Sequence, residues 1–222
     1  FGDQLFTGFL FRQFNYFYKS LPNRYGRSFV ANLNVEFSGA EVEFANVIYN
    51  QFALEPTVFK IGDTDFSRYI RGELEFSLNN IFNPKHSLAF RANVGIGSPF
   101  GGSDDVPYVK QFFIGGPNSI RAFAAREIGP GAHCSADVHG AICGVDVADE
   151  NNNVPFYQTG TVKLEANLEY RFDIASFFGN TIEGAVFLDA GNVWLTEQDE
   201  NRRNAQFLFS AFDMTDIDRL GI

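Results

Sequence analysis

Hydrophobic and polar residues alternate along much of this chain. The alternation is clearest in residues 28–38, 68–78, 88–96 and 161–173. In the last of these stretches Leu164 and Leu168 belong to an apolar set at even positions, while Glu165 and Glu169 belong to a charged or polar set at odd positions. A period of two is typical of a β-strand with one apolar face and one polar face. Each of the four stretches therefore predicts an amphipathic strand.

Weaker signals predict further strands near residues 5–11, 42–61 (one or two strands), 108–115, 181–194 and 206–212. Clusters of Gly, Pro, Asn and Asp between these stretches are typical of turns. No stretch shows a convincing helical period. The sequence therefore predicts an all-β fold of about eight to ten successive, antiparallel strands of about ten residues each.

Alternation alone does not say which face of the strands meets water. In a soluble sandwich or lipocalin-like barrel the apolar face points inward, whereas in an outer-membrane barrel it points to lipid and the polar face lines the lumen. Three features favour the membrane version: strands close to the length of a tilted transmembrane strand, charged residues at consecutive positions of the polar faces, and aromatic residues near strand ends. These aromatic residues are Phe14, Tyr16, Phe17, Tyr18, Phe112, Phe113, Phe177 and Phe178. We therefore predict a partial transmembrane β-barrel, with a soluble β domain as the alternative.

Composition narrows the choice of function. The chain has 222 residues, 45% of them hydrophobic, which excludes a disordered protein. Its 27 Phe suit an apolar surface that is spread over a wall rather than concentrated in one core. The formal net charge of -10 argues against a nucleic-acid partner, because phosphate binding needs clustered Lys and Arg. It does not exclude a membrane.

The alternation stops for a long loop between about Gly115 and Gly160. Loops of this length are usually functional or disordered. The first part is rich in Gly and Pro and has Ile120 and Phe123 to pack with, whereas the part after residue 133 is polar and acidic, as expected of a loop outside the cell.

Two cysteines, Cys134 and Cys143, lie in the acidic part of the loop. A disulfide formed in an oxidising compartment is the leading interpretation. The neighbouring His133 and His139 leave a Cys/His metal site as an alternative, although the spacing matches no standard zinc pattern. Two free thiols are the third alternative.

No arrangement of residues predicts catalysis. The three His residues lie in no motif with a Ser or Cys nucleophile, and no helix follows the glycines at 95–102 to hold a phosphate. We expect a non-enzyme without catalytic residues, cofactor or metal.

Two motifs carry a resemblance to a known family. The first lies in the long loop, and the second, Phe187 to Trp194, lies two strands later. The loop motif comprises Gly115, Gly116, Ser119, Ile120, Arg121, Phe123, Gly129 and Pro130, and the strand motif comprises Phe187, Asp189, Gly191 and Trp194. In these residues the chain resembles the BamA/TamA family of outer-membrane assembly proteins, and Glu169 corresponds to a family Glu on the strand between. The chain departs from the family pattern at Ala122, where the common form has Gly, and at Ile120, where it has Val.

The resemblance implies that the loop folds back into the barrel and that Arg121 pins it to Glu169 and Asp189. The alternation independently places both carboxylates on the polar faces of adjacent strands, where one guanidinium can bond both. The alternative is that Arg121 is a solvated loop residue and Asp189 forms an Asx-turn at a strand end.

At the level of the whole chain, the resemblance implies one partial barrel domain over residues 1–222, about half of a barrel of about 16 strands, with its long loop at 116–160. The family's periplasmic POTRA domains and the last strands are expected to be absent from these residues. The implied location is the outer membrane of a double-membraned bacterium, crossed many times by strands. The implied function is insertion or translocation of other proteins. The implied partners are outer-membrane lipid, client β-barrel proteins, and accessory assembly lipoproteins or other periplasmic proteins. A passive porin or channel is the alternative function.

Overall fold

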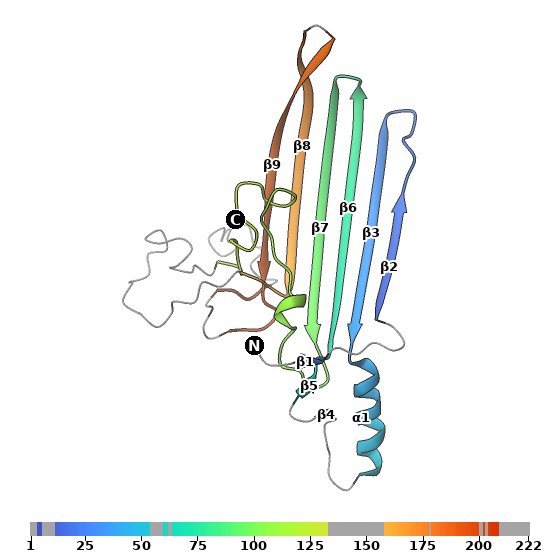
Figure 1. The fold of residues 1–222 in the computed structure, drawn as a ribbon, viewed down its shortest axis with the longest axis vertical. Helices are drawn as coiled ribbons and strands as arrows, with labels where there is room; N and C mark the ends of the chain where they lie inside the picture. Colours follow the sequence, from blue (N-terminus) through green and yellow to red (C-terminus); the bar gives the residue numbers. More distant parts are fainter. Residues whose placement is uncertain are drawn as a thin grey trace, which may run out of the picture.

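The computed structural model describes residues 4–5, 12–53, 60–61, 64–132, 158–177, 179–199, 202 and 204–208. Most of them build one antiparallel sheet, in which each strand pairs with the next of the set along the chain, in the order β2-β3-β6-β7-β8-β9 (Figure 1). The strands are β2 (Gln13–Lys19), β3 (Arg27–Ser38), β6 (Tyr69–Asn83), β7 (His86–Pro99), β8 (Val162–Phe177) and β9 (Asn180–Trp194). Within the described residues this sheet is open, with β2 and β9 at its edges. The predicted antiparallel β fold is confirmed, although the chain also contains one α-helix.

Smaller elements lie beyond one end of the sheet. Helix α1 (Ala40–Phe52) follows β3, and a 3-10 turn (Tyr108–Lys110) follows β7. The short strands β1 (Gln4–Leu5), β4 (Lys60–Ile61) and β5 (Thr64–Phe66) form a second sheet, in which β1 runs parallel to β5 and β4 antiparallel to it. None of the helices in the described ranges is long and apolar enough to cross a membrane.

The sequence-based prediction of strands within 42–61 was wrong for residues 40–52, which form α1. Phe44, Ile48 and Phe52 recur every fourth residue, which is a helical spacing, but Glu41 and Glu43 alternate with Val42 and Phe44 as they would in a strand. Gly39, with a φ of 75°, ends β3 and allows the chain to turn into the helix.

Other boundaries also differ from the prediction. Residues 108–115 are not a strand, because the 3-10 turn follows Pro107 and only Phe112 makes an isolated bridge, to Gly160. Strand β2 was missed because it has aromatic residues on both faces. Residues 206–208 contain one isolated bridge and no strand, and residues 6–11 and 209–212 lie outside the described part of the chain.

The two faces of the sheet have opposite character. The register places Leu33, Leu74 and Val94 in one row of the apolar face, and this face is exposed: Leu74 is 46% and Leu188 is 68% accessible. An apolar surface that spans six strands is far larger than a soluble monomer leaves uncovered. The opposite face is polar and receives the long loop.

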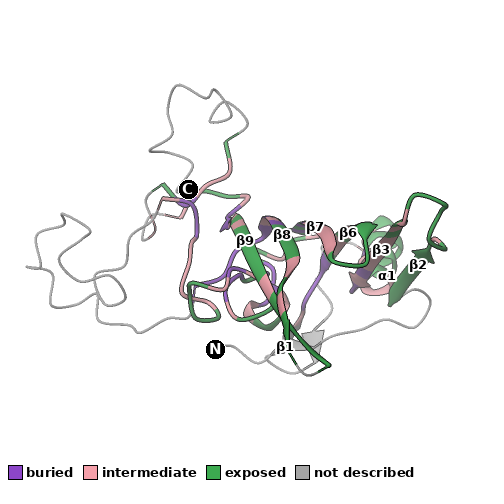
Figure 2. Cartoon of the chain, turned by 90° about the horizontal axis from the view of Figure 1, so that it is seen from above, coloured by how far each residue is buried: buried purple, intermediate pink, exposed green. Residues whose placement is uncertain are grey.

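Buried residues concentrate where this loop meets the sheet (Figure 2). We call the end of the sheet that bears α1 and the long loop the loop end, and the end with the three short connections the turn end (Figure 1). The main core cluster comprises Phe112, Ile114, Ile120 and Val193, with Ile128 packed against it. The hydrophobic core of the described residues therefore lies between the long loop and the six-stranded sheet, which we call the wall.

Candidate functional site

The first part of the long loop packs on the polar face of the sheet. The ring of Phe112 covers Gly95 of β7 so closely that a Cβ at Gly95 would lie 2.6 Å from a ring carbon. The guanidinium of Arg71, on β6, lies 4.1 Å from the centre of the same ring. Glycine at position 95 therefore makes room for the aromatic side chain that seats the loop.

A tight turn built on two glycines then presents the Ser119–Phe123 segment to the wall. Gly115 and Gly116 have φ values of 96° and 93°, and a Cβ at Gly115 would lie 2.1 Å from the carbonyl oxygen of Ala124. The N–H of Gly115 donates to the Ser119 hydroxyl over 3.1 Å. No residue with a side chain fits at Gly115 without moving the backbone.

Arg121 lies between two carboxylates on adjacent strands. Its Nη1 donates to Glu169 of β8 over 2.6 Å, and its Nε and Nη2 donate to Asp189 of β9 over 3.0 and 3.2 Å. The backbone N–H of Arg121 also donates to Asp189, over 3.2 Å. Asp189 is only 5% exposed, so this fork-like contact is largely shielded from water.

The surroundings hold the guanidinium in place and keep it charged. Its centre lies 4.0 Å from the centre of the Phe187 ring, a cation–π contact. Hydrogen bonds from Arg121 to Asp189 raise the pKa of the guanidinium above its already high ordinary value. Because the charge is permanent and partly desolvated, losing either carboxylate would be costly.

A second attachment joins the loop to β7 and β8. The Ser119 hydroxyl donates to Glu165 of β8 over 2.8 Å, and Arg91 of β7 donates to the other oxygen of Glu165 over 2.9 Å. Arg91 also donates to the backbone carbonyl of Asn118. Asn167 joins the two attachments, because its amide donates to the Ser119 carbonyl over 2.9 Å and to Asp189 over 3.0 Å.

Replacing Glu165 with Gln is expected to loosen the loop while the barrel stays folded. The substitution removes the charge shared by Arg91, Ser119 and Lys163 but leaves Arg121 in place. Charge-assisted hydrogen bonds contribute about 1.5–3 kcal/mol each, so amide hydrogen exchange in residues 112–120 should rise by at least tenfold. Glu75→Gln is the matched control, because Glu75 lies on the same polar face, opposite Asn32 and Asn93 in the register, and has no loop partner among the described contacts. Equal exchange in both variants would show that Glu165 does not hold the loop.

The two ends of the segment are tied down separately. Near its start, Lys110 pairs with Glu36 of β3 over 2.6 Å, and the buried Tyr69 hydroxyl donates to the same carboxylate over 2.9 Å. Near its end, the N–H of Gly131 donates to Val193 of β9 over 2.6 Å. The loop therefore crosses the wall from β3 to β9.

The remaining motif residues support this path. Gly129 has a φ of 91° and lies against Val193, Pro130 is fully buried, and Trp194 packs beside Gly131. Gly191 lies where a Cβ would be 2.7 Å from the backbone of β8. Phe123, by contrast, is 42% exposed.

Ala122 fits the loop without strain. Among the described non-glycine residues only Arg126 and Asn204 have a positive φ. Alanine at 122 therefore needs no left-handed backbone, and the departure from the family pattern is tolerated there. Cys134 and Cys143 lie outside the described residues, so their pairing stays a prediction.

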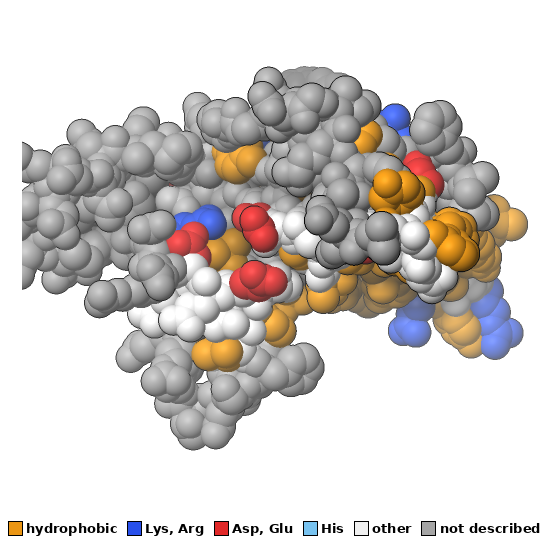
Figure 3. Space-filling view, turned by 90° about the horizontal axis from the view of Figure 1, so that it is seen from below, with side chains coloured by type: hydrophobic (Ala, Val, Ile, Leu, Met, Phe, Trp, Pro, Cys, Tyr) orange, Lys and Arg blue, Asp and Glu red, His pale blue; other side chains and the backbone are white. Residues whose placement is uncertain are grey.

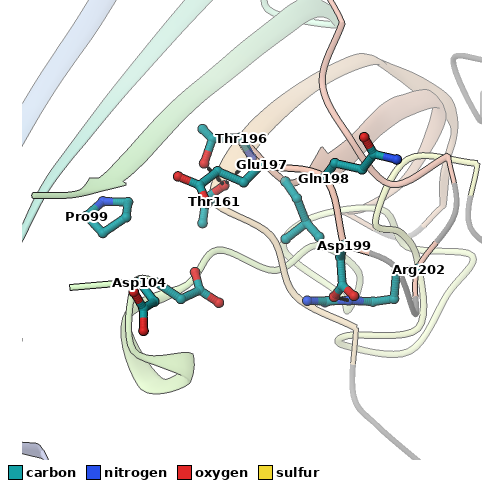
Figure 4. A pocket seen from close by; sticks show the side chains of 10 residues that line it. Pro99, Asp104, Thr161, Thr196, Glu197, Gln198, Asp199 and Arg202 are labelled. Atoms are coloured by element: carbon teal, nitrogen blue, oxygen red, sulfur yellow. Dashed lines mark hydrogen bonds and ion pairs between the residues drawn. The ribbon is translucent and has the colours of Figure 1, made fainter. Parts of the chain in front are cut away.

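An acidic hollow opens at the loop end, beside the site (Figures 3 and 4). Its lining includes Asp104, Asp105, Glu197 and Asp199, and Arg202 donates to Asp199 over 2.7 Å. The part of the chain that the structure describes contains no group of three or more His, Cys, Asp or Glu that could hold a metal ion. The lining of this hollow therefore carries more negative than positive charge.

Sequence reasoning missed several residues of the site. Arg91, Lys110 and Asn167 belong to no motif, and Glu36 lies on a strand without family features. The signal that could have found them is the alternation itself, because all but Lys110 occupy polar-face positions of predicted strands.

A model of a known protein family matches most of the chain. The model of the Omp85 superfamily domain matches residues 26–211, a range that includes the long loop and both of its strands. The match agrees with the resemblance to the BamA/TamA family. Proteins of this superfamily are outer-membrane β-barrels that insert or translocate other proteins, and they are not enzymes. The chain belongs to the Omp85 superfamily.

Proposed function

We propose that this chain is the barrel portion of a BamA/TamA-type factor that inserts or translocates outer-membrane proteins. The observation that supports this most is Arg121, held by Glu169 and Asp189 in a loop that crosses the polar face of the sheet. In a barrel this face lines the lumen. A loop held there occupies space that a diffusion pore needs for its solutes.

The loop would act by keeping this side of the barrel rigid. It contacts β7, β8 and β9 through charged groups and β3 through Lys110. Strand separation during insertion of a client would then fall elsewhere in the barrel, where unpaired strand edges can template an incoming strand. Local thinning of the bilayer beside the barrel would further lower the energy barrier to insertion of the client. Clients are β-barrel proteins, and accessory lipoproteins or other periplasmic proteins would deliver them.

Within this class three members remain candidates: a general insertase, a TamA-like paralogue and a two-partner secretion transporter. All three share the loop and strand motifs, and we favour the first two, which differ from each other mostly in regions outside residues 1–222. The alternative from another class is a passive porin whose loop narrows the pore.

A depletion experiment separates the two classes. Depleting the protein in its own host should lower the amounts of several folded outer-membrane barrels, and the wild-type gene should restore them. A porin predicts unchanged client barrels and reduced uptake of small hydrophilic solutes. That second pattern would refute the proposed function.

A further inference from the structure

Two of the three connections at the turn end are basic, whereas the third, between β8 and β9, lies near Asp173 and Glu183. Segments 18–31 and 76–91 contain five Lys or Arg residues and no Asp or Glu, in a chain whose net charge is -10. The five are Lys19, Arg24, Arg27, Lys85 and Arg91. Arg91 serves the loop attachment and Lys19 lies on the polar face, opposite Val30. Arg24, Arg27 and Lys85 remain as an exposed basic group with no part in the site described above.

Two neighbouring connections pack tightly at this end. The N–H of Ile81 donates to the carbonyl of Gly26 over 3.0 Å, and a Cβ at Gly26 would lie 2.3 Å from the Ile81 carbonyl oxygen. The side chain of Asn23 accepts hydrogen bonds from the N–H groups of Tyr25 and Arg27, over 2.9 and 3.0 Å. The turn is therefore ordered by its own contacts.

A hollow lies between these connections and combines charge with apolar surface. It is lined by Arg24, Tyr25, Gly26, Arg27, Asn80, Ile81 and Phe82. Tyr25, Ile81 and Phe82 are all exposed. Arg24 stacks on Tyr25 at 4.8 Å and donates to its hydroxyl over 2.7 Å. Neither arginine pairs with a carboxylate within the described ranges. Two cations beside apolar side chains fit an amphiphile with a negative head better than a free anion.

The hollow faces the membrane side of the wall. Arg27 lies opposite Asn80, in register with the apolar face that continues through Phe29 and Leu78. Other aromatic side chains also lie near the turn end, where the rings of Tyr170 and His86 stack with their centres 5.9 Å apart. Aromatic belts mark the headgroup level of a membrane, and short connections mark the periplasmic side of an outer-membrane barrel. The hollow therefore lies at the level of the inner-leaflet headgroups.

We propose that Arg24 and Arg27 bind the phosphate of an anionic phospholipid in the inner leaflet of the outer membrane. Tyr25, Ile81 and Phe82 contact the first part of its acyl chains, and Lys85 in the next turn adds positive charge. The proposal rests on the membrane location of the superfamily and is independent of the role of the loop.

Lipid association measured with spin-labelled phosphatidylglycerol and phosphatidylcholine tests this proposal, with the protein reconstituted in vesicles. The wild type should prefer phosphatidylglycerol, and Arg24→Gln/Arg27→Gln should reduce this preference by about fivefold per arginine at low salt, since each surface charge is worth about 1 kcal/mol. Arg24→Lys/Arg27→Lys should keep most of the preference, because the charge is retained. Inorganic phosphate at constant ionic strength should not displace the lipid.

The matched control is Arg12→Gln, which removes an exposed arginine from the other end of β2. It should leave the preference unchanged. Equal loss in this control, an unchanged preference in the double Gln variant, or displacement by inorganic phosphate would each overturn the proposal. Heat-modifiable migration in gels confirms that each variant is folded, and client insertion, measured separately, reports the proposed function without affecting the lipid result.

Discussion

Replacing Arg121 with Glu is expected to destabilise the folded barrel more than any other single change in the loop. Three negative groups would then meet on one patch of the wall, and Glu169 and Asp189 would lose the cation they share. Breaking a buried pair costs about 3–5 kcal/mol. Because the side chain of Arg121 is partly exposed, screening should place the loss near the lower end of this range. Heat-modifiable migration in a gel measures the folded fraction, which should fall clearly.

The control for this experiment is Arg171→Gln. Arg171 donates to the same Glu169, over 2.6 Å, but it belongs to the wall and its side chain is mostly exposed. Its loss should change the folded fraction little. If Arg121→Glu migrates like the wild type, or if Arg171→Gln is equally harmful, the loop is not held by this contact.

Replacing Leu74 with Arg should destabilise the barrel by about 2–4 kcal/mol, the cost of a cation near the middle of a lipid-facing strand. Leu74 lies in the middle of the apolar face of β6, between Leu33 and Val94. Urea unfolding of the protein in phospholipid vesicles measures the change in the free energy of unfolding.

The matched variant is Asn32→Arg on the polar face of β3. Asn32 lies opposite Glu75 in the register, so an added cation would meet a carboxylate and water. This variant should lose little stability. If Asn32→Arg were the more harmful of the two, the polar face and not the apolar face would meet the lipid.

Periodicity predicted the wall well because alternation on a strand depends only on which face meets the apolar phase. The strands around 28–38, 68–78, 88–96, 161–173 and 181–194 are all present, and most extend farther than predicted because paired strands continue into the short connections. The same reasoning put Glu169 and Asp189 on one face, and the structure has Arg121 against both.

Periodicity did not predict helix α1, whose apolar side chains face outward and not toward a core. Helix α1 turns Glu43 and Asn46 inward, where Glu43 pairs with the buried Arg68 over 2.9 Å, and leaves Phe44 and Phe52 exposed. The helix therefore departs from the usual rule that the apolar stripe faces the core. Alternation places Arg91 and Glu165 on the polar face, but it does not show that Ser119 bonds Glu165 beside Arg91, because that contact depends on the path of the loop.

The central claim is that Arg121 holds the loop to the wall through Asp189 and Glu169, and a double-mutant cycle tests it most directly. The free energy of unfolding in vesicles is measured for the wild type, Arg121→Leu, Asp189→Leu and the double variant. If this contact holds the loop, the two changes are not additive, and their coupling energy is about 1–3 kcal/mol. Additive effects, with a coupling energy near zero, would contradict it.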